Sequence, residues 1–172
     1  CAGHSLGEYS ALVASKALDL ETAAKLLKTR GISMQKSVPI GQGAMAALIG
    51  SSIEQAEQLA KKISDQNIDL VCDVANDNAP GQVVLSGHAD AIEAAINLSV
   101  DYGAKKAMRL PVSAPFHCSL MRPAADIMKD ALSNSNIIDP IVPLIPNVTA
   151  KPEAQAEKIT DLLVRQVTGR VR

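Results

Sequence analysis

The chain has 172 residues, of which 47% are hydrophobic and 20% charged, so it is long and apolar enough to bury a core as one large domain or two small ones. Its 17 basic and 18 acidic side chains give a net charge of −1, and only 2% of the residues are aromatic. This composition argues against a nucleic-acid partner, which needs a basic surface or stacking rings, and no apolar run reaches the roughly 18 residues of a membrane span.

The apolar spacing predicts helices and strands in an order that indicates the fold class. In chain order the elements are a helix over 5–16, a helix over about 20–36 with Asp19 as N-cap, a loop at 39–43, a strand over 44–50, a helix over 52–64, a strand over 70–75, a turn at 76–81, a strand over 82–86, a helix over 89–102 and a strand over 106–112. A helix over 119–133, a strand near 141–148 and a helix over 153–168 follow.

The middle of the chain has the order of a ferredoxin-like unit, which is strand, helix, strand, strand, helix, strand. It is inserted between two helical stretches. We therefore expect an α/β protein of two parts, in which residues 42–112 form a small subdomain and residues 1–41 and 113–172 belong to one larger body.

Residues 3–7 read GHSLG and match the G-x-S-x-G pattern of a nucleophile elbow. In such an elbow the glycines allow a sharp turn into a helix, which lifts the hydroxyl of Ser5 clear of the backbone. The N-terminus of the following helix offers free N–H groups to a developing oxyanion. The alternative is a glycine-rich turn with a capping serine.

A serine nucleophile needs a base, and the chain has three histidines. His4 is a poor candidate, because neighbouring side chains at an elbow diverge. His88 reads as a turn or cap residue. His117 lies in a restricted loop between a strand and a helix, where a positioned base is expected, although it could equally be a surface histidine.

Two polar residues occupy positions where helical periodicity calls for apolar ones. Arg30 shares a helix face with Ala23, Leu27 and Met34, so it points toward the packed side and needs an anion. Gln166 lies in the same way beside Ile159 and Leu162. The alternatives are a snorkelling arginine and an amide at the flank of its helix.

No metal or cofactor site is expected. The GQG at 41–43 lacks the rest of a dinucleotide or phosphate-loop fingerprint, and the acidic residues show no paired spacing. Cys1, Cys72 and Cys118 are odd in number and far apart, which fits a reducing cytoplasm rather than a disulfide framework.

These motifs together resemble the malonyl-CoA:acyl carrier protein transacylases, an acyltransferase family whose relatives include the acyltransferase domains of polyketide synthases. The similar segments are GHSLGEY at 3–9, NAPGQVV at 78–84, SAPFHC at 113–118 with LM at 120–121, NV at 147–148 and LVRQ at 163–166. They run in order over nearly the whole chain.

The resemblance implies that Ser5 is the acyl-accepting nucleophile and His117 its general base and later acid. It implies that a main-chain carbonyl at Gln166 orients the histidine, that Arg30 pairs with the malonyl carboxylate, and that the Leu6 N–H is an oxyanion donor.

Further implied positions are Phe116, in a loop of the malonyl type, and the weaker pocket positions His4, Asn78 and Gln82. The implied fold is an incomplete α/β-hydrolase-like body with the ferredoxin-like subdomain inserted.

The function implied is transfer of malonyl from malonyl-CoA to the phosphopantetheine thiol of acyl carrier protein in fatty acid biosynthesis, in the cytoplasm and without a cofactor. Lys105, Lys106 and Arg109 are candidates for docking the acidic carrier. The family's GQGSQ segment and the strand that enters the elbow are missing, so we expect a fragment of a longer enzyme. The alternatives are a polyketide synthase domain, a serine esterase or patatin-like hydrolase, and a ferredoxin-like interaction module.

Overall fold

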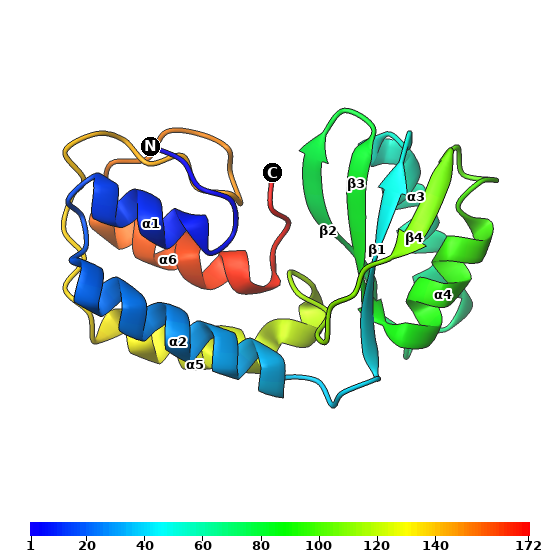
Figure 1. The fold of residues 1–172 in the computed structure, drawn as a ribbon, viewed down its shortest axis with the longest axis horizontal. Coiled ribbons are helices and arrows are strands. Elements are labelled where there is room, and N and C mark those ends of the chain that lie inside the picture. Colours follow the sequence, from blue (N-terminus) through cyan, green and yellow to red (C-terminus); the bar gives the residue numbers. More distant parts are fainter.

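The computed structural model describes residues 1–172, which fold into a helical lobe and a sheet lobe (Figure 1). The helices are α1 (Gly7–Ala14), α2 (Leu20–Lys36), α3 (Ile53–Gln66), α4 (Ala89–Leu98), α5 (Arg122–Ser133) and α6 (Ala156–Thr168), with a short 3-10 turn η1 (Ser119–Met121). The strands are β1 (Gly43–Ile49), β2 (Cys72–Ala79), β3 (Gln82–His88) and β4 (Lys106–Arg109). No helix combines the length and the apolar character needed to cross a membrane.

The predicted helices are confirmed, with shifts at their ends that have local causes. The side chain of Asp19 caps α2 by accepting the N–H of Thr22 at 2.8 Å, as expected. Helix α1 begins at Gly7 rather than Ser5, because Ser5 has a left-handed backbone with φ of 53°. Helix α4 ends at Leu98, and the chain then turns through Gly103, whose φ is 85°.

The sheet has the strand order β2-β3-β1-β4, and every neighbouring pair is antiparallel. Successive residues of β1 point to opposite faces. Ala44, Ala46 and Leu48 pack into the cluster formed with α3 and α4, whereas Met45 lies in a small cluster on the other face, next to Phe116. The sheet therefore offers its second face to the helical lobe.

Two sequence predictions were wrong in part. Strand β2 continues through 76–79 with two irregularities in its register, so the turn is confined to Pro80 and Gly81. The strand expected near 141–148 is reduced to single bridges, Ala2 to Ile145 and Leu144 to Glu153. The prolines of this segment lack the N–H that a regular ladder requires; they are Pro140, Pro143 and Pro146.

The lobes have separate hydrophobic cores, and the last residues of the chain join them. Tyr9, Leu12 and Met128 belong to the core of the helical lobe. Val171 pairs with the edge strand β2, donating to the Ala75 carbonyl at 2.9 Å and accepting from the Asp77 N–H at 2.8 Å. The end of α6 is thereby held close to the sheet.

Candidate active site

The turn that carries Ser5 depends on one of its two glycines. A Cβ on Gly3 would overlap the carbonyl oxygen of Gly7, so only glycine fits at position 3. A Cβ on Gly7 would meet nothing within 4 Å. The sequence pattern assigns both glycines to the turn, but the close approach of the backbone explains only the first.

Asn147 holds this turn from the neighbouring loop. Its Oδ1 accepts the Ser5 N–H at 2.7 Å, and its Nδ2 donates to the Gly3 carbonyl at 2.7 Å. Asn147 appeared in the sequence only as part of a matching segment, with no role assigned. Its single signal was a polar residue in a proline-bounded loop.

The structure brings Ser5 and His117 together although 112 residues separate them in the sequence. The Ser5 Oγ lies 2.7 Å from His117 Nε2, and His117 Nδ1 lies 2.8 Å from the main-chain oxygen of Gln166. Because a carbonyl oxygen can only accept, Nδ1 carries the hydrogen and Nε2 is free to accept the serine proton. The geometry is that of a nucleophile, a base and an orienting group.

Burial sets the charge of this histidine. His117 is 4% exposed, and desolvation lowers its pKa from 6.5 to about 4, aided by the positive charge of Arg30 and opposed by the hydrogen bond to Gln166. His117 is therefore neutral near pH 7, as a base must be.

Arg30 extends from α2 into the same site. It is 6% exposed, and its Nη2 donates to the Ser5 Oγ at 3.1 Å and to Gln166 Oε1 at 2.9 Å. Its buried Nε has no partner, and none of the ion pairs in the structure involves it. Burial lowers the pKa of this guanidinium. A buried cation with a free donor is suited to an anion that enters the site.

A cavity of about 410 Å³ opens on these groups between the two lobes. Ser5, Arg30 and His117 form its polar end. The rest of its lining is mainly apolar and includes Met34, Met45, Leu110, Val112 and Phe116. The cavity can therefore receive a small acyl chain with a charged end against Arg30.

The remaining predicted positions lie at different distances from the chemistry. Leu6 and His4 line the cavity, and no acceptor is bonded to the Leu6 N–H. Asn78 does not line it but bonds to His4, with 2.9 Å between Nε2 and Oδ1. Gln82 is exposed where β3 begins and is not brought to the site. Asn76 lines the cavity and was missed by the sequence reasoning.

Glu8 was also missed. It is fully buried in the first turn of α1, and its Oε2 accepts from Gln166 Nε2 at 2.6 Å and from the Asn147 N–H at 3.1 Å. In the sequence, an acidic residue in the first turn of a helix is ordinary, because its charge complements the positive end of the helix dipole. Only the folded structure reveals the buried partners of Glu8.

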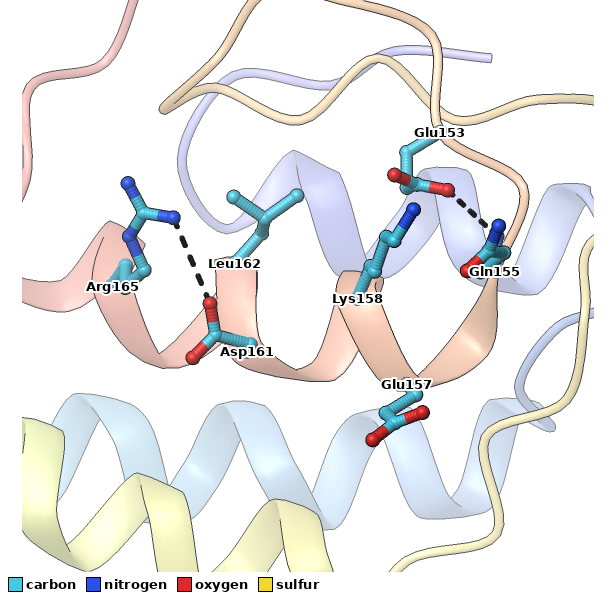
Figure 2. Close-up of a pocket in the computed structure, with 7 residues that line it drawn as sticks. All are labelled: Glu153, Gln155, Glu157, Lys158, Asp161, Leu162 and Arg165. Atoms are coloured by element: carbon cyan, nitrogen blue, oxygen red, sulfur yellow. Dashed lines mark hydrogen bonds and ion pairs between the residues drawn. The ribbon is translucent and has the colours of Figure 1, made fainter.

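A larger depression of about 550 Å³ lies over the first turns of α6 (Figure 2). It shares no residue with the Ser5 cavity, and its lining is charged and exposed, as in the Asp161–Arg165 pair at 3.7 Å. It contains no serine, cysteine or histidine and no nucleophile paired with a base, so the chemistry belongs to the smaller cavity.

Comparison with known proteins agrees with this geometry. Residues 1–169 match the family described as the acyl transferase domain. The chain is 44% identical over 171 residues to the malonyl CoA-acyl carrier protein transacylase of Bacillus subtilis and 45% identical to that of Escherichia coli, covering 99% of this chain and 53% and 54% of the relatives.

Solved structures give the same result. The acyl-carrier-protein-S-malonyltransferase of Bartonella henselae is 51% identical, with a TM-score of 0.94 over 99% of this chain and 54% of that one. A malonyl-transacylase in complex with a type II polyketide synthase acyl-carrier protein is 42% identical, with a TM-score of 0.94 over the same shares. The chain spans about half the length of the relatives that it matches.

Proposed function

The chain belongs to the acyl transferase domain family, and on that premise we propose that it transfers a malonyl group from malonyl-CoA to the phosphopantetheine thiol of an acyl carrier protein in fatty acid biosynthesis. The observation that carries this proposal is the Ser5–His117 contact at 2.7 Å beside the buried guanidinium of Arg30.

In the first half-reaction the Ser5 Oγ attacks the thioester carbonyl carbon while its proton passes to His117 Nε2. The resulting oxyanion accepts from the free N–H of Leu6, just before α1, because the N–H groups of Gly7 and Glu8 are already bonded to backbone carbonyls. The intermediate collapses, the C–S bond breaks, and His117 returns the proton to the CoA sulfur. A malonyl ester on Ser5 remains.

The second half-reaction is the reverse with a new thiol. His117 takes the proton of the carrier's phosphopantetheine thiol, the sulfur attacks the ester, and Ser5 leaves with the proton. General base catalysis of this kind contributes roughly 10²–10⁴-fold. We propose that no metal or cofactor takes part, since proton transfer by His117 accounts for both steps.

Arg30 supports a dicarboxylic acyl group rather than a neutral one. A planar guanidinium can bind a carboxylate through two parallel hydrogen bonds. A neutral ester gives Arg30 no anionic partner, so a serine esterase would carry a buried charge without a use for it. This disfavours the hydrolase alternative.

The carrier protein and the compartment belong to the same proposal. Lys106 and Arg109 are exposed on the edge strand β4 and Lys105 is exposed just before it, so all three can meet an acidic carrier. Free Cys1, Cys72 and Cys118 support a reducing compartment such as the cytoplasm.

For the architecture, we propose a ferredoxin-like subdomain over 42–112 within an α/β-hydrolase-like body made of 1–41 and 113–172. The strand order β2-β3-β1-β4, its antiparallel pairs and the separate cores of the two lobes support this division.

The test is transfer of labelled malonyl from malonyl-CoA to a holo acyl carrier protein, with the protein expressed from its full coding sequence. The apo carrier, which lacks the thiol, is the matched control. Label on the holo carrier alone is expected, and fatty acid and polyketide carriers compared side by side distinguish the two pathways. Release of free malonate without label on either carrier would favour a hydrolase.

A further inference from the structure

We propose that Glu8 is a positioning residue, whose buried carboxyl group fixes the side-chain amide of Gln166 and thereby holds Arg30 where it can bind the acyl carboxylate. This inference rests on the proposed function. Glu8 touches neither Ser5 Oγ nor His117 through a side-chain hydrogen bond; its carboxyl group accepts from Gln166 Nε2 and from the Asn147 N–H, and of these two residues only Gln166 is bonded to Arg30.

The amide of Gln166 has four different partners, and their chemistry determines its orientation. Its Nε2 donates to Glu8 Oε2 at 2.6 Å, to the Ser5 carbonyl at 2.9 Å and, more weakly, to Asn147 Oδ1 at 3.5 Å. Its Oε1 accepts from Arg30 Nη2 at 2.9 Å. The terminal torsion of a glutamine is broad, so the packing of the chain alone does not set it.

Reversing the amide would face its oxygen to three acceptors and its NH₂ to the Arg30 donor. Glu8 makes the shortest of these three contacts, and it is the one acceptor among them with an ionisable group. The acceptor at Glu8 is therefore the strongest of the contacts that turn Oε1, and not NH₂, toward Arg30.

The arrangement does not depend on the protonation state of Glu8. Burial raises the pKa of this carboxyl group, whereas hydrogen bonds from Gln166 and Asn147 and the charge of Arg30 lower it. Both donors contact Oε2, and Oε1 is buried without a partner. A proton on Oε1 would leave Oε2 an acceptor.

Glu8 should affect Arg30 more than His117. Arg30 is bonded to the side-chain oxygen of Gln166, which Glu8 orients, but His117 is bonded to the main-chain oxygen, which α6 holds. Losing the Glu8 acceptor should therefore reduce acylation by malonyl, which needs Arg30, more than acylation by acetyl, which does not.

The experiment compares initial rates of Ser5 acylation by malonyl-CoA and acetyl-CoA in the protein expressed from its full coding sequence. Glu8→Met removes the acceptor and keeps the chain length, and Glu8→Gln keeps one acceptor oxygen. We expect Glu8→Met to lower the malonyl-to-acetyl ratio about tenfold or more and Glu8→Gln to keep it within about threefold.

Leu12→Ala, one turn further along α1, controls for general loss of stability, because Leu12 is buried in the apolar core away from the amide. It should lower the melting temperature without changing the ratio. If Glu8→Met does not fold, Glu8→Asp replaces it, because aspartate keeps the carboxyl group but its side chain is shorter by one methylene. The malonyl-to-acetyl ratio should again fall.

A folded Glu8→Met or Glu8→Asp variant with the wild-type ratio would overturn the inference, as would a Glu8→Gln variant that loses as much as Glu8→Met. A wild-type protein that accepts neither acyl group would instead refute the proposed function, and this inference with it.

Discussion

The hydroxyl oxygen of Ser5 lies 2.7 Å from Nε2 of His117, and both residues have left-handed backbones, with φ of 53° and 59°. A non-glycine residue in this region costs of order 1–3 kcal/mol. Both residues keep this costly conformation because neighbouring groups hold them. Asn147 accepts the N–H of Ser5, and the Gln166 carbonyl accepts from the ring of His117. The predictions below follow from this arrangement.

Asn147→Ala should destabilise the protein by about 1–3 kcal/mol, because it leaves the Ser5 N–H and the Gly3 carbonyl without their partner. Equilibrium urea unfolding measures the change. Asn147→Asp keeps the acceptor for the Ser5 N–H and loses the donor to the Gly3 carbonyl. Its free energy of unfolding should therefore lie between those of the wild type and Asn147→Ala. A variant as stable as wild type would show that the turn does not need this residue.

Gly3→Ala should cost about 3 kcal/mol or more, because its Cβ would overlap the backbone of Gly7. Gly31→Ala is the matched control: it lies within α2 in open space, and it should gain about 0.5–1 kcal/mol in helix propensity. Thermal or urea unfolding of the Gly3→Ala and Gly31→Ala variants tests whether the first is destabilised and the second stabilised. Equal effects would contradict the steric explanation.

The sequence was sufficient for the elements that local rules determine. The cap at Asp19, the helix that follows Ser5 and the strand and helix order of the sheet lobe could all be read from short-range patterns. Pattern reasoning failed near 141–148, where a run of apolar residues looked like a strand but the prolines removed its donors.

The site was only partly readable for a different reason. Ser5, His117 and Arg30 stand out because a motif, a restricted loop or a charge on an apolar face marks each of them. Glu8 and Asn147 have no such mark, since their roles come from contacts across 158 and 142 residues. Long-range hydrogen bonds leave no periodic trace in a single sequence.

Arg30→Ala should lower the rate of malonyl transfer about 10–100-fold, because it removes a charge-assisted pair with the acyl carboxylate. Acetyl transfer should change by no more than a few-fold. Steady-state rates with the two CoA thioesters measure this. Arg30→Lys keeps the charge without the planar fork and should recover only part of the loss. An equal loss for both acyl groups would argue against the carboxylate contact.

The acylation rate should keep its full value at pH values well below 6.5, the ordinary pKa of a histidine. It should fall as the pH is lowered through about 4, because His117 then takes up a proton and can no longer accept one from Ser5. Rapid-quench measurements of Ser5 acylation over a series of pH values determine where the rate falls. Burial raises the pKa of the neighbouring Glu8 carboxyl group, so the same pH series on the Glu8→Gln variant separates the two groups. A fall in rate centred near pH 6.5 would show that His117 is exposed to solvent in the working enzyme.

The same depressed pKa predicts a slope in stability. Between about 4 and 6.5 the unfolded chain binds a proton at His117 that the folded chain does not, so the contribution is complete above 6.5 and is lost as the pH falls through about 4. The slope is at most about 1.4 kcal/mol per pH unit. Urea unfolding of wild type and His117→Gln should show the wild type steeper, and parallel curves would contradict this.

The most direct test of the whole account is the covalent intermediate. The protein expressed from its full coding sequence is mixed with malonyl-CoA, quenched in acid and weighed intact, beside Ser5→Ala. We predict one added malonyl group that maps to the peptide containing Ser5, that a holo acyl carrier protein removes, and that Ser5→Ala never acquires. A malonyl group on Ser5→Ala, or none on the wild type under turnover, would contradict Ser5 as the nucleophile.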